Sequence, residues 1–301
     1  MRILITGGAG FIGSHIAAYF HDKADVVVLD NLRTGKAENL AGLKVDFIRG
    51  DVRDRVKLAR AMKNVDYVFH LAAMIGVPES MANPLECIDI NVNGTLMVLE
   101  EAARAGVKKL IYASSAAVYG NADNLIRRED MCTDPKSVYA VTKLDGELYC
   151  RIFSENGRLK TVSLRYFNVF GPRQDPDSAY AAAPALFCNR AILGKKIRIY
   201  GDGEQRRDFV YVEDVVKVNA LFMENDLEGV YNVATGCSVT INELLKRILF
   251  MTDSQSEVEY LPERAGDIRY LHASTDKLHS AGIRCNTNLA ASLGSTINSY
   301  K

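Results

Sequence analysis

The first half of the chain alternates short apolar runs with longer stretches in which apolar residues recur every three or four positions. The runs predict β-strands and the periodic stretches predict helices, an alternation typical of βαβ units and a parallel sheet. Residues 26–29, VVVL, are apolar without alternation, as in a strand buried on both faces. The five runs are RILIT (2–6), ADVVVLD (24–30), VDFIRGD (45–51), VDYVFHLAA (65–73) and VKKLIYASS (107–115).

The second half changes character after Gly171 and Pro172. Before that point, a predicted helix at 137–154 and a predicted strand at 159–167 extend the sheet. After it, short strands and Ala-rich or Gly-rich pieces dominate, with strands at 195–203 and 229–233 and helices near 212–225 and 240–251. We therefore expect an α/β fold, with a doubly wound parallel (Rossmann) sheet over residues 1–167 and a smaller, mainly substrate-binding lobe over 168–301. Some segments of that lobe could return to the first domain.

Glycines stand at the junction of the first strand and the first helix. The spacing of Gly7, Gly10 and Gly13 permits a tight turn and lets a pyrophosphate approach the helix N-terminus. Asp30 ends the next strand, where a carboxylate accepts ribose hydroxyls and repels a 2′-phosphate. The pattern predicts NAD rather than NADP, although Arg33 and Lys36 nearby favour a phosphate.

Asp51 and Val52 end the strand after that. Two interpretations stay open for them, a contact with the adenine edge of the cofactor and an ordinary solvated end of a strand.

A second group of polar residues follows the fifth strand. Ser114 and Ser115 end that strand, and Tyr139 and Lys143 lie four residues apart, on one face of a helix that Ser137 would cap. A phenol needs roughly 4 kcal/mol to lower its pKa by about three units. An ammonium ~5 Å away supplies roughly 3 kcal/mol at an effective dielectric constant of ~20, and an oxidised nicotinamide adds a second positive charge. We expect Tyr139 to be a general base, assisted by Ser115 and Lys143.

The spacing of Tyr139 and Lys143 is not specific by itself. Tyr19 and Lys23 have the same spacing. They fall on the helix behind the glycine loop, so we interpret them as a structural pair.

Composition narrows the classes of function. The 37 Lys and Arg residues balance the 37 Asp and Glu residues, which argues against a nucleic-acid partner. No apolar run is long enough to span a membrane and no signal segment is visible, so we expect a cytoplasmic protein. The six cysteines lie far apart, as expected for reduced thiols rather than for disulfides or a metal site.

Taken together, these motifs resemble the extended short-chain dehydrogenases/reductases, and within them the nucleotide-sugar epimerases of the UDP-glucose 4-epimerase type. The matching segments run in order along the chain: TGGAGFIGSH, Asp30-Asn31-Leu32, GDV, HLAA, NVNGT, SSAAVYG, YAVTK, RYFNVFGP, GDGEQRRDFVYV and ERAGD.

The resemblance implies further site residues. Besides Gly7, Gly10, Gly13, Asp30, Asp51, Val52, Ser114, Tyr139 and Lys143, it implies cofactor contacts from Phe11, Ile12, Asn31, Leu71, Ala72, Asn91 and Phe167. Besides Ser115 and Tyr139, it implies substrate contacts from Ser80, Asn168, Arg207, Arg264 and Asp267. The alternative for each arginine is a surface ion pair, and His70 is interpreted as a packed strand-end residue. The resemblance implies no metal, and a homodimer through the helices near 91–105 and 139–154.

One departure from relatives bears on the reaction. Dehydratases of this superfamily carry an Asp-Glu pair where this chain has Ala116 and Ala117, and methyl groups cannot transfer protons. This departure disfavours loss of water. The resemblance then implies inversion at C4 of a UDP-hexose (UDP-glucose/UDP-galactose, or an N-acetyl or uronic acid analogue), with NAD oxidising the sugar to a 4-keto intermediate that turns over before it is reduced again. The alternatives are a nucleotide-sugar dehydrogenase or decarboxylase, a non-enzymatic NAD sensor, and a structural protein that retains the fold.

Overall fold

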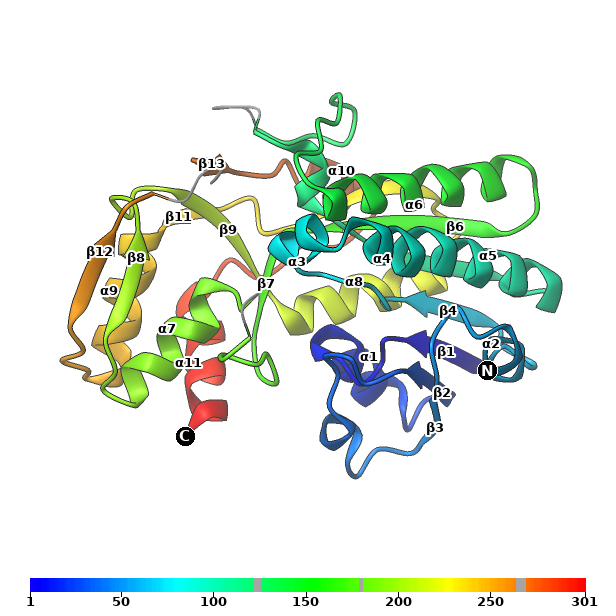
Figure 1. The fold of residues 1–301 in the computed structure, drawn as a ribbon, viewed down its shortest axis with the longest axis horizontal. Helices are drawn as coiled ribbons and strands as arrows, with labels where there is room; N and C mark the ends of the chain where they lie inside the picture. The colour runs from blue at the N-terminus through cyan, green and yellow to red at the C-terminus, as the bar shows by residue number, and fades with distance from the viewer. Residues whose placement is uncertain (122–125, 179–180, 264–268) are drawn as a thin grey trace. The chain divides into compact units, whose positions relative to one another are not determined.

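The computed structural model describes residues 1–121, 126–178, 181–263 and 269–301. The described chain forms two compact units (Figure 1). Unit 1 comprises residues 1–118, 135–165 and 216–231, and unit 2 comprises residues 119–134, 166–215 and 232–301. Residues 216–231 return to unit 1, as the sequence analysis allowed, whereas residues 119–134 belong to unit 2.

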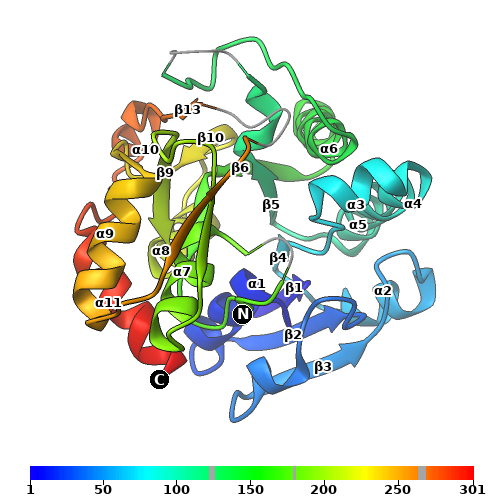
Figure 2. The same cartoon turned by 60° about the vertical axis from the view of Figure 1, so that its left-hand side comes forward.

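Unit 1 is built on a seven-stranded sheet with the order β10-β6-β5-β4-β1-β2-β3. Its strands are β1 (Arg2–Thr6), β2 (Asp25–Asp30), β3 (Val45–Arg49), β4 (Tyr67–His70), β5 (Lys109–Ser115), β6 (Lys160–Tyr166) and β10 (Gly229–Val233). β1 pairs in parallel with β2 and β4, and β4 pairs in parallel with β5. Figure 2 shows β3, β2, β1, β4, β5 and β6 side by side. The expected Rossmann sheet is confirmed, with its reversal of strand order at β1.

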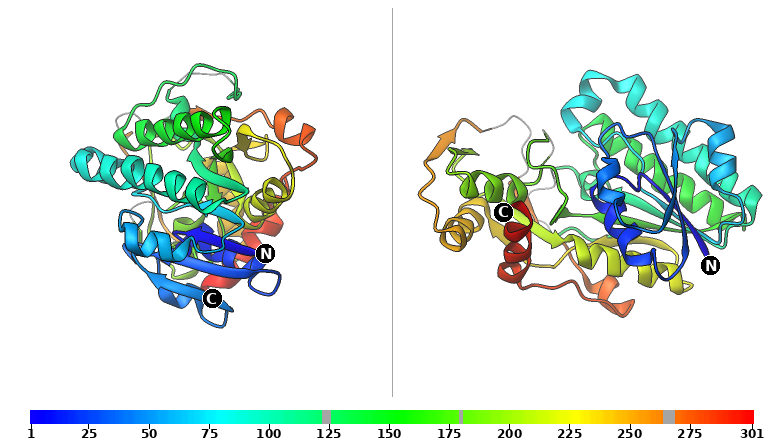
Figure 3. Two further views of the ribbon diagram at one scale, coloured as in Figure 1. Left: turned by 90° about the vertical axis from the view of Figure 1, so that its right-hand side faces the viewer. Right: turned by 90° about the horizontal axis from the view of Figure 1, so that it is seen from below.

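Helices cover both faces of this sheet. They are α1 (Phe11–Phe20), α2 (Arg55–Ala61), α3 (Val77–Ala82), α4 (Pro84–Ile88), α5 (Gly94–Ala105), α6 (Val138–Glu155) and α8 (Val212–Glu224). Short helical turns occupy Ala37–Leu40, Asp89–Asn93 and Ala116–Tyr119. Figures 1 and 3 show α5 and α6 on one face and α8 on the other.

The two faces of the sheet are separate apolar layers, because successive residues of a strand point to opposite sides. Leu4, Leu110 and Tyr112 pack with residues of α2, α5 and α6. On the other side Phe69 stacks on Phe20 of α1, with ring centres 5.5 Å apart. Successive residues inside β1, β2 and β4 are buried, whichever face of the sheet they point to, which explains why these runs are continuously apolar in the sequence.

Unit 2 contains smaller sheets. β9 (Arg206–Tyr211) pairs with β7 (Asn168–Phe170), β11 (Ser238–Thr240) and β13 (Tyr270–Leu271), and β8 (Ile197–Tyr200) pairs with β12 (Val258–Leu261). Its helices are α7 (Ala183–Ile192), α9 (Ile241–Thr252), α10 (Asp276–Ser280) and α11 (Leu289–Tyr300). α7, α9 and α11 pack on one another. Within the part of the chain described, no helix is long and apolar enough to cross a membrane.

His70 lies in the interior of unit 1 and is 1% exposed. Its two ring nitrogens contact the hydroxyls of Thr6, at 2.7 Å, and Thr95, at 2.9 Å. The packed strand-end histidine expected from the sequence is confirmed. Burial lowers the pKa of His70 to about 3.

The low pKa of His70 predicts a loss of stability in acid. Between pH ~6.5 and ~3 the unfolded chain binds a proton at this site and the folded protein does not, so stability falls as the pH falls. At pH 5 the loss from this group is about 2 kcal/mol. In His70→Asn the drop in the free energy of urea unfolding between pH 7 and pH 5 should be smaller by that amount. His279→Asn, which changes a half-buried histidine of α10, should retain the wild-type drop; an unchanged drop in His70→Asn contradicts the assignment.

Candidate active site

The glycine loop joins β1 to α1 and has the shape that a pyrophosphate requires. Gly7 has φ +71°, and a Cβ atom there would lie 2.7 Å from the main-chain nitrogen of Ala72. A Cβ atom at Gly13 would collide with the carbonyl oxygen of Gly7. Gly10 is the N-cap of α1 and has no side chain that could cap the helix. The N-terminus of α1, from Phe11 and Ile12, therefore offers main-chain N–H groups and a positive dipole end to an anion, so the loop fits the NAD pyrophosphate.

Asp30 connects this loop to the loop after β2. Its Oδ2 accepts a hydrogen bond from the amide of Ala9 at 2.9 Å, and its Oδ1 accepts one from the amide of Leu32 at 2.8 Å. The side chain is buried, and burial raises the pKa of Asp30 from its usual value. A carboxylate has about four acceptor positions, so two remain for the hydroxyls of a ribose.

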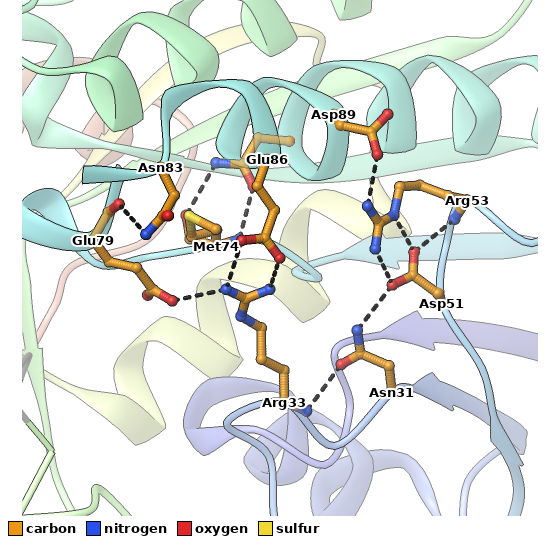
Figure 4. Close-up of polar contacts among 10 residues, drawn as sticks. Asn31, Arg33, Asp51, Arg53, Met74, Glu79, Asn83, Glu86 and Asp89 are labelled. Carbon is orange, nitrogen blue, oxygen red and sulfur yellow. Dashed lines mark hydrogen bonds and ion pairs between the residues drawn. The ribbon is translucent and has the colours of Figure 1, made fainter. Parts of the chain in front are cut away.

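Asp51 forms an ion pair with Arg53 and a hydrogen bond with Asn31. Arg53 donates to both of its carboxylate oxygens at 2.8 Å, and the Asn31 amide donates at 3.0 Å. These hydrogen bonds hold the pKa of Asp51 well below its usual range. Val52 beside it is buried. Figure 4 shows this group below the helices that carry Asp89. Contact with adenine stays a prediction for Asp51 and Val52, as does a contact of Asn31 with the cofactor.

Tyr139 and Lys143 lie in the first turns of α6, above the end of β5. Ser137 caps the helix as expected, accepting the amide of Ala140 at 3.2 Å. Lys143 is 4% exposed, and its ammonium donates to the carbonyl of Ala113 at 2.8 Å. The Lys143 Nζ atom lies 5.9 Å from the centre of the Tyr139 ring. The structure thus brings the three predicted catalytic residues to one end of β5, since Ser115 ends that strand and Lys143, beside Tyr139, bonds to Ala113 within it.

The electrostatics of Tyr139 differ from the expectation. Burial raises the pKa of the phenol, and the hydrogen bond with Ser115 opposes that rise. Burial also lowers the pKa of Lys143 to about 8, so its ammonium is mostly charged at neutral pH but loses its proton slightly above it. The ammonium does not outweigh the loss of water around the phenol, because both groups are buried together. Lowering the phenol pKa therefore needs the second cation of the sequence prediction, the oxidised nicotinamide.

A buried ion pair below the catalytic residues escaped the sequence analysis. Glu147 accepts two hydrogen bonds from Arg165, at 2.9 and 2.7 Å, and one from the hydroxyl of Ser114. Both charged side chains are about 95% buried. Tyr139, Lys143 and Glu147 are spaced four residues apart and therefore lie in a row on one face of α6. This spacing was the signal in the sequence that could have identified Glu147. The Ser114 hydroxyl donates to Glu147, and the cofactor contact of Ser114 stays a prediction.

Two more residues brace the site instead of facing a ligand. Ser80 is fully buried; its hydroxyl donates to the Val77 carbonyl at 2.7 Å and accepts the Tyr139 amide at 3.1 Å. This geometry gives Ser80 a positioning role at the start of α6, and its contact with the sugar stays a prediction. Asn91 is 1% exposed, and its amide bonds both main-chain groups of Met74 and the Thr142 hydroxyl. A direct bond from Asn91 to the cofactor stays a prediction.

Leu71 and Ala72 follow β4 beside the glycine loop. Their amides donate to the carbonyl and the hydroxyl of Thr6, at 3.1 and 3.3 Å. Together with the close approach of Ala72 to Gly7, these bonds fix the chain at the C-terminal edge of the sheet, where open α/β sheets bind ligands.

The predicted diphosphate contacts Asn168 and Arg207 lie in unit 2. Asn168 begins β7 opposite Phe209 of β9, and its amide donates to the carbonyl of Asp208 at 2.9 Å. Arg207 is two residues before Phe209 and is half-buried, so it is a strand residue near Asn168 rather than an exposed surface cation. Phe167 is buried, with its ring 6.3 Å from that of Tyr119. Arg264 and Asp267 lie outside the described residues.

The second tyrosine–lysine pair has the structural role expected for it. Lys23 Nζ lies 3.2 Å from the centre of the Tyr19 ring, and Tyr19 is 38% exposed. This is a cation–π contact on the surface of α1. The six cysteines are free thiols, as predicted.

The Glu147–Arg165 pair predicts a stability cycle. Arg165→Met leaves a buried carboxylate without its cation and should lower the free energy of unfolding by about 3–5 kcal/mol. Arg165→Met/Glu147→Met removes both charges and should be more stable than either single variant. Urea unfolding of the four proteins measures the cycle; purely additive losses contradict the pairing.

Comparison with known proteins agrees with this site. Residues 3–234 match the model of the NAD dependent epimerase/dehydratase family. The UDP-glucose 4-epimerase of Mycolicibacterium smegmatis is 37% identical over 280 residues, which cover 89% of this chain and 88% of that protein.

Solved structures are similar over almost the whole chain. A UDP-N-acetylglucosamine 4-epimerase from Methanobrevibacter ruminantium, in complex with UDP-N-acetylmuramic acid, has a TM-score of 0.96 and 41% identity, covering 99% of this chain and 97% of that chain. The UDP-glucose 4-epimerase of Thermus thermophilus in complex with NAD has a TM-score of 0.92 and 38% identity, covering 100% and 99%. With the glycine loop, Asp30 and the Tyr139–Lys143 pair in place, the chain belongs to the NAD-dependent epimerase/dehydratase family.

Proposed function

We propose that the protein is an NAD-dependent UDP-sugar 4-epimerase. The observation that carries the proposal is the placement of Tyr139, Ser115 and Lys143 at the end of β5, on the sheet edge where the glycine loop lies. The epimerases named above, similar over nearly the full chain, support it. Ala116 is buried and Ala117 half-buried where dehydratases carry acid and base, which favours epimerisation over loss of water.

The chain's own residues would divide the work of proton transfer. Tyr139 removes the proton of the sugar 4-hydroxyl and returns it after the sugar has turned over. Ser115 shares the hydrogen bond to the same oxygen, and Lys143 supplies positive charge below the phenol. NAD, when bound, accepts hydride from the sugar carbon and gives it back to the opposite face, so no net oxidation results.

Binding of the substrate would rest on unit 2. Asn168 and Arg207 lie on neighbouring strands, and an arginine guanidinium suits the oxygens of a diphosphate. Anchoring the diphosphate leaves the sugar free to rotate while it is held in the site. Arg264 and Asp267 remain proposed contacts with the diphosphate and the nucleotide ribose.

The decisive experiment uses Tyr139→Phe. Proton NMR of the purified protein with a panel of UDP-hexoses, N-acetyl hexosamines and uronic acids should show anomeric signals interconverting within one pair. Removal of the phenolic hydroxyl deletes the general base and should slow turnover by about 10²–10⁴-fold, while bound NAD is retained.

The matched control is Tyr19→Phe, which changes the tyrosine of the other Tyr-Lys pair. It should epimerise at the wild-type rate. A Tyr139→Phe protein with unchanged turnover excludes the proposed base, and stoichiometric accumulation of NADH with UDP-hexose points to a dehydrogenase instead.

We also propose that unit 1 forms a homodimer through the face of α6. Val141, Leu148 and Ile152 lie on one side of this helix and are 38–44% exposed. Leu85 and Ile88 of α4, which packs beside α6, are exposed as well. A second copy of the chain would cover these apolar side chains, in line with the resemblance.

The dimer proposal predicts the effect of charge on this face. Leu148→Glu/Ile152→Glu places two carboxylates in the proposed contact and should convert the dimer to a monomer in light scattering coupled to size exclusion. Val56→Glu, at an exposed apolar position of α2, should leave the mass unchanged. A wild-type protein that is already monomeric rejects the proposal.

A further inference from the structure

Arg33 lies three residues after the ribose-binding acid Asp30. In dinucleotide-binding folds an arginine near this position accommodates the 2′-phosphate of NADP. The chain therefore carries signals for both cofactors at one site, a carboxylate that repels the phosphate and a guanidinium that would attract it.

The structure holds this guanidinium against two glutamates of α3 and α4. Arg33 donates to Glu86 of α4 at 2.5 Å and 3.3 Å, and to Glu79 of α3 at 2.8 Å. Figure 4 shows both carboxylates converging on the end of the Arg33 side chain from the helices above it. Two charge-assisted contacts fix the fork of the guanidinium in one direction.

The main chain of Arg33 is fixed as well. Its amide donates to the Asn31 side chain at 2.9 Å, and the Asn31 amide group donates in turn to Asp51. Leu32 between them has φ +61°, a left-handed conformation that a leucine adopts only where its surroundings impose it. The direction of the Arg33 side chain is thus determined from both ends, by the loop and by the two glutamates.

We propose that Glu79 and Glu86 are cofactor-selectivity residues, which favour NAD over NADP by holding Arg33 away from the ribose 2′ position. With the guanidinium engaged by Glu79 and Glu86, a 2′-phosphate would meet the carboxylate of Asp30 without the Arg33 cation to receive it. An NAD ribose hydroxyl, being uncharged, does not experience this repulsion. The proposal concerns the cofactor alone and does not depend on which sugar is the substrate.

The test releases Arg33 while preserving the shape of its partners. Glu79→Gln/Glu86→Gln removes both negative charges. The wild-type and variant proteins are equilibrated with an equimolar mixture of NAD and NADP and desalted, and the bound dinucleotides are released and quantified. The ratio of bound NADP to bound NAD should rise at least tenfold in the double variant.

Two further variants isolate the cause. Adding Arg33→Met to the double variant should return the ratio to within about twofold of the wild type, because the cation that receives the phosphate is gone. Glu38→Gln removes a charge from an exposed position close by and should leave the ratio unchanged. Asp30 and Lys36 are present in every variant, so their contributions cancel.

Three results would overturn the proposal. They are an unchanged ratio in the double variant, a raised ratio that survives Arg33→Met, and a loss of bound NAD without a gain of NADP, which would make the ion pairs a simple closure of the site. Thermal melting of each variant verifies folding. Epimerisation by NMR is measured separately, so a failure of this proposal is distinguishable from a failure of the proposed function.

Discussion

The site depends on burying one ammonium next to one phenol. Lys143 has almost no exposed surface, and its hydrogen bond to the Ala113 carbonyl is the contact that keeps its charge beneath Tyr139. Removing an ammonium from water is costly unless polar partners receive it. The end of β5 provides such a partner, and one turn further along α6 the Glu147 carboxylate adds a negative charge that favours the ammonium. The contact between α6 and β5 therefore determines both the position and the charge of the Tyr139–Lys143 pair.

For Tyr139, the proposed base, this arrangement makes loss of the proton depend on a second cation. Without a bound cofactor, burial favours the neutral phenol of Tyr139, and burial lowers the pKa of Lys143 to about 8. A second cation, at the nicotinamide position, is then needed to lower the pKa of the phenol. Coupling of this kind ties proton transfer to the oxidised state of the cofactor, which suits a reaction in which the sugar is oxidised first and reduced afterwards.

Much of this could be predicted from the sequence because the signals are local. Continuous apolar runs located the strands, the glycine spacing located the phosphate loop, and the spacing of Tyr139 and Lys143 placed them on one helical face. The rest depends on partners distant in sequence. Glu147 meets Arg165 and Ser114 only after three elements have packed, and Arg33 meets Glu86 across 53 positions of the chain. Ser80 is the clearest case, since the resemblance implied a substrate contact and its burial and hydrogen bonds show that it also holds the start of α6.

The same long-range contacts bear on how a reaction without net redox change keeps its cofactor. Arg33 pairs with Glu79 and Glu86, and Arg53 pairs with Asp51 and, at 2.6 Å, with Asp89. Each arginine comes from a loop after a strand on one side of β1, and each reaches the helical segment that follows β4. Both connections span the point where strand order reverses, beside the glycine loop, and both are made entirely within unit 1. These ion pairs thus belong to unit 1 alone, whereas the proposed diphosphate contacts Asn168 and Arg207 belong to unit 2.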